Sequence, residues 1–239
     1  MLESRITLAD GAHKIVDNVV VAHGAAGGLL NILILLLLTS AILIVGIRTA
    51  ERAIALLVLQ STILAAIATV VAVVSGTAEI YVSVVATLAV KAVLVPFMLF
   101  RVLRRVGSVE TARMYLGARN ATVVALGLVL LAYALISPTA IAGTLITGSY
   151  FPTSVALILV GGLVMVVRRK ALIQVIGLIV IENGVYVASM ATTHGLPPVV
   201  ELGIAFDLFV TVLLLATLAL RIGVSSETLD TSALRRLRG

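Results

Sequence analysis

The amino-acid sequence contains no cysteine among its 239 residues. The chain therefore forms no disulfide and ligates no iron–sulfur cluster, because thiolates are the ligands that such clusters need. If the protein works in a redox assembly, the electrons pass through other subunits. Charge is also scarce: 12% of the residues are charged and 61% are hydrophobic, whereas soluble domains are roughly 45–50% apolar. This composition predicts an all-α integral membrane protein, a polytopic helix bundle.

Motifs for chemistry within the chain are missing as well. No set of His, Asp and Glu has metal-ligand spacing, and no nucleophilic triad or phosphate-binding loop is recognisable. We therefore expect no catalytic site, no bound cofactor and no metal in this chain. The net charge of +6 does not indicate a nucleic-acid partner, because the cations stand beside the ends of apolar runs, where they orient membrane helices. The expected surroundings are the lipid bilayer and other membrane proteins.

Seven apolar runs are predicted to cross the membrane as helices. They cover residues 28–47, 53–75, 80–100, 121–136 and 153–167, the run between Lys170 and His194, and residues 199–220. Residues 1–27 lack the short basic start and the small-residue cleavage site of a signal peptide, so we expect an interfacial segment there, with an extension of the first span as the alternative. Residues 223–239 form a short polar tail.

The positions of the cations predict the topology. Fourteen of the seventeen Lys and Arg residues lie in the connections after spans one, three, five and seven, and none lies after spans two, four or six. Cytoplasmic loops carry the excess of Lys and Arg. The N-terminus is therefore expected outside and the tail in the cytoplasm.

The order of turns also repeats along the chain. Thirty-one residues separate Arg48 from Glu79, and thirty-two separate Arg169 from Glu201. Each interval holds a basic turn, one span, an outer turn and a Glu at the start of the next span. This pattern predicts two three-helix units, 28–105 and 153–222, with 106–152 as a connector that contains the fourth helix. The alternative is that any two hairpins of bilayer length give similar spacings.

Three ionisable residues are predicted to lie inside the membrane. Glu182 follows Arg169 by thirteen residues, which is about 20 Å along a helix and near the middle of a hydrocarbon core about 30 Å thick. Asp207 lies at a similar depth before Arg221, and Lys91 lies roughly 15 Å inside its span. Each such group costs about 2.5–3.5 kcal/mol on insertion scales. We predict that Glu182, Asp207 and Lys91 form a proton relay.

Other polar residues are expected to support this relay. Asn183 and Gln60 are predicted to hydrogen-bond between helices, and Glu79 and Glu201 lie at the outer interface, where they are either solvated or part of a proton exit. Pro96 has no N–H, so the carbonyl four residues earlier loses its helical donor close to Lys91. The alternative for Glu182 is a permanently protonated side chain that only holds helices together.

Several of these motifs resemble one family in the same order. Lys91 to Pro96, the run Glu182-Asn183-Gly184, the stretch from Val200 to Asp207, and the tail motif Thr228-Leu229-Asp230 are similar to component E of hydrogenase-4. That family is a membrane subunit of nickel–iron hydrogenase complexes of the formate-hydrogenlyase type. The last three spans also resemble the K-type subunit of respiratory complex I and the C-type subunit of multisubunit sodium/proton antiporters. Ile179 occupies the place of the first intramembrane Glu of the complex I subunit, and Glu182 follows about 4.5 Å further along the helix.

The resemblance implies a non-catalytic subunit in a prokaryotic plasma membrane. It would link antiporter-like and other membrane subunits and contribute to proton or sodium translocation, while peripheral nickel–iron and iron–sulfur subunits carry out the redox chemistry. Two alternatives stay open. One is a component of a cation/proton antiporter complex without redox subunits, and the other is a structural spacer whose buried charges only determine helix register.

Overall fold

The computed structural model describes residues 24, 26–75, 84–85, 88–106, 115–136, 150–168 and 171–192. The described residues lie almost entirely in helices, which confirms the all-α class. The predicted seventh span, the tail and most of the N-terminal segment lie outside the described residues, as do Asp207, Glu79 and Glu201.

The helices follow the predicted spans closely. The helix Ala26–Gly46 leads into α2, Ala50–Ser75. The π-helix η1, Leu88–Leu94, continues into α4, Val95–Val106. The next helices are α5, Ala118–Leu135, α7, Phe151–Val167, and α8, Ala171–Thr192.

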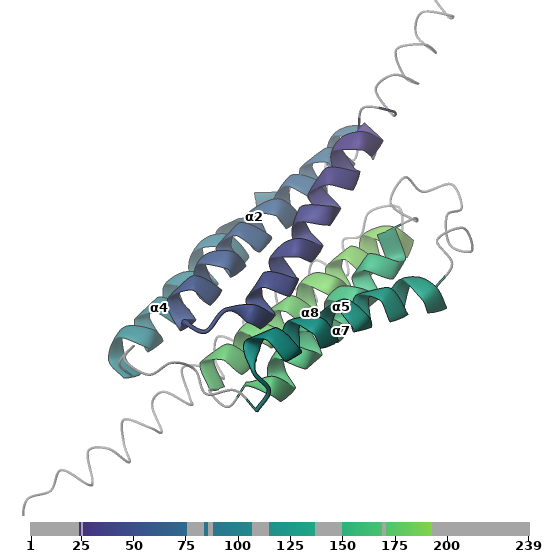
Figure 1. The fold of residues 1–239 in the computed structure, drawn as a ribbon. Helices are drawn as coiled ribbons and strands as arrows, with labels where there is room; N and C mark the ends of the chain where they lie inside the picture. Colours follow the sequence, from purple (N-terminus) through teal and green to yellow (C-terminus); the bar gives the residue numbers. More distant parts are fainter. Residues whose placement is uncertain are drawn as a thin grey trace, which may run out of the picture.

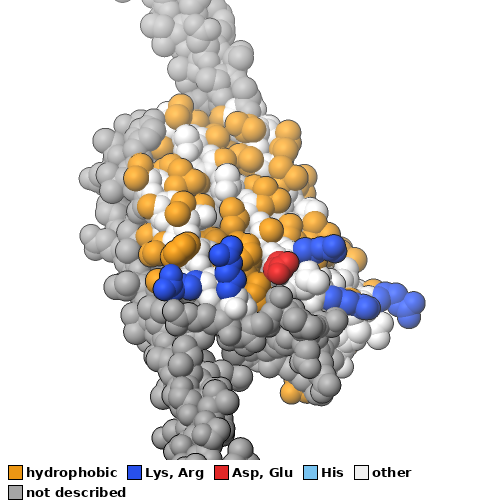
Figure 2. Space-filling view, turned by 90° about the vertical axis from the view of Figure 1, so that its left-hand side faces the viewer, with side chains coloured by type: hydrophobic (Ala, Val, Ile, Leu, Met, Phe, Trp, Pro, Cys, Tyr) orange, Lys and Arg blue, Asp and Glu red, His pale blue; other side chains and the backbone are white. Residues whose placement is uncertain are grey.

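Four of the described helices are long and apolar enough to cross a membrane, and α7 is a shorter apolar helix. The surface has the corresponding character, because large apolar side chains point outward, with Leu130 71% and Leu135 74% exposed on α5. Apolar side chains cover most of the face in Figure 2. A helix that is apolar all round is typical of a membrane span. These features define a multi-pass membrane protein.

The described helices form two groups that lie side by side (Figure 1). Ala26–Gly46, α2 and α4 lie in one group, and α5, α7 and α8 in the other. Within the second group α7 and α8 approach each other so closely that their glycines have no room for a side chain. A Cβ at Gly161 would lie 2.7 Å from the carbonyl oxygen of Gly177, and a Cβ at Gly184 would lie 2.9 Å from that of Ser154. Small residues at such contacts allow close backbone packing in membranes.

One end of the bundle gathers the helix ends that carry cations. Arg168, directly after α7, donates hydrogen bonds to carbonyls near the end of the first helix, and the backbone N–H of Tyr115, just before α5, donates to Val167 at 3.0 Å. Figure 1 shows α4 ending beside the start of α2. The exposed cations of these segments are Arg48, Arg52, Arg101, Arg104 and Arg119, and basic side chains form a band at one end of the apolar surface in Figure 2. Among the described residues, the cations that the sequence assigned to one membrane face thus share one end of the bundle, and which face that is stays a prediction.

Candidate functional site

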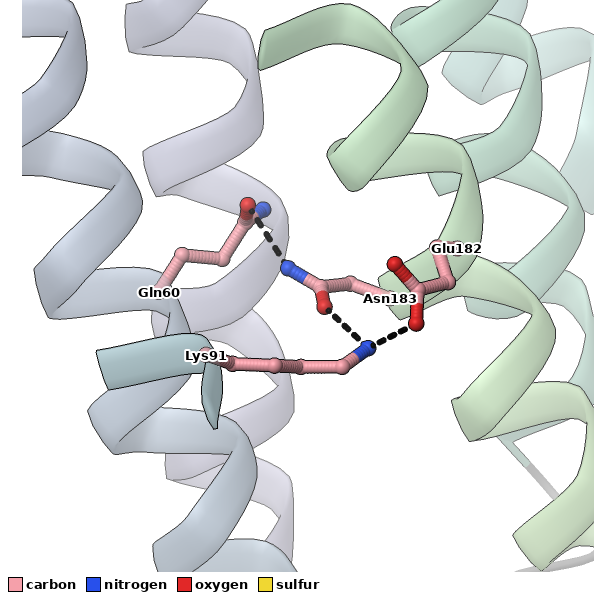
Figure 3. A network of polar contacts seen from close by, with 4 residues as sticks. All are labelled: Gln60, Lys91, Glu182 and Asn183. Carbon is pink, nitrogen blue, oxygen red and sulfur yellow. Dashed lines mark hydrogen bonds and ion pairs between the residues drawn. The ribbon is translucent and has the colours of Figure 1, made fainter. Parts of the chain in front are cut away.

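A buried polar network connects three helical elements near the middle of the bundle (Figure 3). Nζ of Lys91 on η1 lies 2.7 Å from Oε1 of Glu182 on α8 and 3.3 Å from Oδ1 of Asn183. Nδ2 of Asn183 donates in turn to Oε1 of Gln60 on α2 at 3.2 Å. The structure therefore brings together four of the residues that the sequence singled out, although Lys91 and Asn183 are 92 positions apart.

The direction of these hydrogen bonds follows from Lys91. An ammonium group can only donate, so the oxygen of Asn183 faces Lys91 and its amide nitrogen faces Gln60. Gln60 then accepts with its oxygen and turns its own nitrogen away. Within the described part of the chain, this nitrogen and the neighbouring Ser61 hydroxyl have no hydrogen-bond partner. The two amides thus hold the network in position, because neither exchanges a proton readily.

The network is almost completely shielded. Lys91 is 4% exposed, Glu182 7%, and both Asn183 and Gln60 0%. Removing two opposite charges from water costs several kcal/mol per ion, and their attraction offsets this only with good geometry and further hydrogen bonds. Here Asn183 supplies a further acceptor for Lys91. The ring of Tyr186 adds another favourable contact, since its centroid lies 5.7 Å from Nζ, within the range of cation–π attraction.

Local sequence explains how α8 presents these groups. Tyr186 follows Glu182 by four residues, so both side chains lie on one face of the helix. Gly177 and Gly184 are seven residues apart and lie against α7. Glycines on one face and polar side chains on another let α8 pack tightly against α7 while it presents charge to α2 and η1.

Lys91 reaches the network from an unusual helical segment. Each residue of η1 is described, and Lys91 alone among its seven residues is buried. Leu88, Val93 and Leu94 are 39%, 66% and 38% exposed. Pro96 predicted a carbonyl without its helical donor in this segment, but the π-helix itself was not predicted, although the proline was the available signal. The contact of Tyr186 with Lys91 was not predicted either, and no local pattern indicates it.

Arg168 was interpreted from sequence as a boundary cation, and the structure refines that interpretation. It lies at the basic end but is only 1% exposed. Its guanidinium donates to the carbonyls of Val45 at 2.8 Å and Ile44 at 3.4 Å, and also to Ile47. The last carbonyls of a helix have no N–H group of the same helix to donate to them, because the helix ends there. A cation at this place is also favourable because the C-terminal end of a helix dipole is negative. Burial lowers the pKa of Arg168, but a guanidinium stays charged in proteins.

No metal site emerges from the described ranges, where no group of three or more His, Cys, Asp or Glu side chains converges. The ion pair itself offers one chemical possibility, which is proton exchange at the carboxylate of Glu182. Protonation would neutralise this carboxylate and remove the ion pair, leaving Asn183 and Tyr186 as the neighbours of Lys91.

The fold and the network define a multi-pass membrane protein with a buried ion pair. The chain is similar to a protein of Mycobacterium tuberculosis (strain ATCC 25618 / H37Rv) named "Uncharacterized protein Rv0085", with 27% identity over 215 residues, which are 90% of this chain and 94% of that protein. No protein-family model and no solved structure matches the chain.

Proposed function

We propose that this chain is a membrane subunit of a hydrogenase-4-like complex and that its buried network takes part in proton or sodium translocation. The observation that carries the proposal is the ion pair between Lys91 and Glu182, 2.7 Å apart and almost fully buried. Ionisable residues inside a membrane bundle are expensive and characteristically mark ion pathways. The order of motifs that resembles hydrogenase-4 component E supports the assignment to that kind of complex.

The arrangement suits a group that is loaded and unloaded with one proton. When Glu182 takes up a proton, the carboxylate charge is lost, while the positive charge of Lys91 is still held by the Asn183 oxygen and the Tyr186 ring. These two contacts leave Lys91 with neighbours in this arrangement, but its shortest contact with α8, the ion pair, is lost. Asn183 and Gln60 act as positioning residues in this scheme.

The proposal includes the residues that lie outside the described ranges. Asp207 serves as a second carboxylate of the relay, because two carboxylates at one depth resist simultaneous ionisation. Glu79 and Glu201 stand at the outer end of the route. The proposed topology has seven spans, with the N-terminus outside and the tail in the cytoplasm of a prokaryotic cell.

Contacts between the two helix groups support the proposed three-helix units. Arg169 follows Arg48 by 121 positions, and Glu201 follows Glu79 by 122. Asn183 and Tyr150 each donate to a residue 123 positions earlier, and the Arg168 contacts span 121 to 124 positions. The Asn183 and Arg168 contacts thus join residues near equivalent positions of the two predicted units, whereas Tyr150 and Gly27 flank those units. We expect such contacts where an axis along the helices relates two parallel repeats.

A structural spacer is the second candidate function. The observation that favours it is the short, buried ion pair between η1 and α8. Such a pair would hold the two helices in register even if no ion moved. The two functions differ in what happens when the charge of Glu182 is removed but its shape is kept.

The test uses the full chain in its membrane complex with Glu182→Gln. We expect normal assembly, judged by mass spectrometry of a mild-detergent preparation, and at least tenfold slower movement of protons or ²²Na⁺ across membrane vesicles. Glu51→Gln is the matched control, because Glu51 is an exposed carboxylate in the first turn of α2, and it should leave ion movement unchanged. Wild-type ion movement in a normally assembled Glu182→Gln complex would exclude the relay and leave the spacer. Nickel–iron subunits in the same preparation distinguish a hydrogenase-like complex from an antiporter without redox subunits.

A further inference from the structure

We propose that η1 is a two-state segment that converts between π-helical and α-helical pairing, and that the ion pair between Lys91 and Glu182 holds it in the π-helical state. The inference rests on the proposed function, because proton uptake by Glu182 is the event that would release the segment. The conversion of η1 would be a conformational change within this chain that accompanies ion translocation.

The sequence provides the reason for two pairings of similar stability. Pro96, in the first turn of α4, has no N–H, so it cannot serve as the donor for the carbonyl four residues earlier. With pairing from residue i to i+5, the carbonyl of Ala92 can accept from the N–H of Phe97, but the carbonyl of Lys91 then loses its donor to the proline instead. Such π segments occur frequently at functional sites. The α-helical alternative has the ordinary backbone geometry but leaves the carbonyl of Ala92 without its donor. Neither pairing is fully favourable.

The packing around η1 lets the ion pair determine whether the segment is π-helical or α-helical. The backbone of η1 packs against α2 and continues into α4. Apart from Lys91, the side chains of η1 are exposed or only half-buried, so little apolar burial distinguishes one rotation of the segment from another. Lys91 of η1 contacts the interior of the bundle through its 2.7 Å ion pair with Glu182 and its 3.3 Å hydrogen bond to Asn183.

The direction of the switch follows from these contacts. A π-helical turn holds one more residue than an α-helical turn, so conversion rotates one flank relative to the other by about 100°, the rotation of one helical residue. A side chain at the surface of a helix about 11 Å wide then moves by about 8 Å. With a charged Glu182 the π state keeps Lys91 in the network. With a neutral residue at position 182 the rotated state becomes populated, and Lys91 turns away from α8. A ligand or proton can shift an equilibrium only through such a difference between two states.

The absence of cysteine makes the test direct. Spin labels on cysteines introduced at Val93 of η1 and Val185 of α8, which are 66% and 45% exposed, report the distance by pulsed electron paramagnetic resonance in the full-length protein in its membrane complex. We expect one distance in the otherwise unchanged chain and a second population, shifted by up to about 8 Å, with Glu182→Gln. Pro96→Ala should produce the same second population with Glu182 intact, because it removes the ring that clashes with the carbonyl four residues earlier in α pairing. Labels at Val166 and Val185, both on the α7–α8 hairpin, should keep their distance in every variant.

One unchanged distance in either variant overturns the switch, and so does a change in the control pair, which would mean a general rearrangement. The outcome is distinguishable from that of the proposed function. Loss of ion movement in Glu182→Gln without a second distance refutes the switch and leaves the relay standing. A second distance together with wild-type ion movement refutes the relay and leaves a conformational switch that is not needed for ion movement.

Discussion

Breaking the buried ion pair from one side should destabilise the bundle much more than replacing both charges. Lys91→Met leaves the carboxylate of Glu182, 7% exposed, without its cation. Removing one partner of a buried pair typically costs about 3–5 kcal/mol because the other charge stays buried without compensation, whereas replacing both partners with well-packed hydrophobic residues of similar volume is often neutral or stabilising. We therefore expect Lys91→Met to lower the free energy of unfolding by about 3–4 kcal/mol.

The double variant Lys91→Met with Glu182→Gln should recover most of that loss. The coupling energy between the two positions follows from the double-mutant cycle, and residues in one network commonly couple by about 0.5–3 kcal/mol. The assay is reversible unfolding of the full chain in mixed micelles, followed by circular dichroism. Glu51→Gln, on an exposed carboxylate, should change the unfolding free energy by less than about 0.5 kcal/mol. If the two single changes simply added in the double variant, the two side chains would not form the pair that the structure shows.

Three further predictions concern packing, the basic end and topology. Gly161→Ala should cost about 1–3 kcal/mol of unfolding free energy, because its Cβ would lie 2.7 Å from a backbone oxygen of α8. Gly162→Ala is the control and should be nearly neutral, because the space around its Cβ is open. Equal effects of the two changes would contradict the close α7–α8 contact. Arg168→Met should cost about 1–3 kcal/mol by leaving carbonyls at the end of the first helix without a donor, and retention of full thermal stability would show that water replaces the guanidinium. A cysteine at Gly195 should react with an impermeant thiol reagent added outside the cell and one at Arg104 should not, and the reverse pattern would invert the predicted orientation.

The interior of the site could be predicted in part because depth in a membrane is a local property. The distance of Glu182 from the basic turn at Arg169 depends only on the rise per residue of one helix. The same argument gave Lys91 a buried position, and the structure shows both side chains buried. The cost of isolated charge in hydrocarbon then made a partner for each of them an expectation.

The particular partners could not be predicted in the same way. Lys91 is 92 positions from Asn183, and Gln60 is 123 positions from it, so their meeting depends on how each helix is rotated about its own axis. That rotation results from the packing of all the helices together, including the glycine contact between α7 and α8. The contacts of Arg168 could not be predicted for the same reason. A cation at a helix end has the same sequence pattern whether it faces water or the carbonyls of another helix.

The sequence by itself thus determined the all-α membrane class of the protein, the positions of the described helices and the burial of Lys91 and Glu182, because apolar length and helical rise are properties of single segments. Only the tertiary structure decided that Lys91 pairs with Glu182 across the bundle, that Asn183 points its oxygen at Lys91, and that the helix before Pro96 takes π pairing. These features arise between segments, where side-chain contacts select one arrangement among several that the local backbone allows.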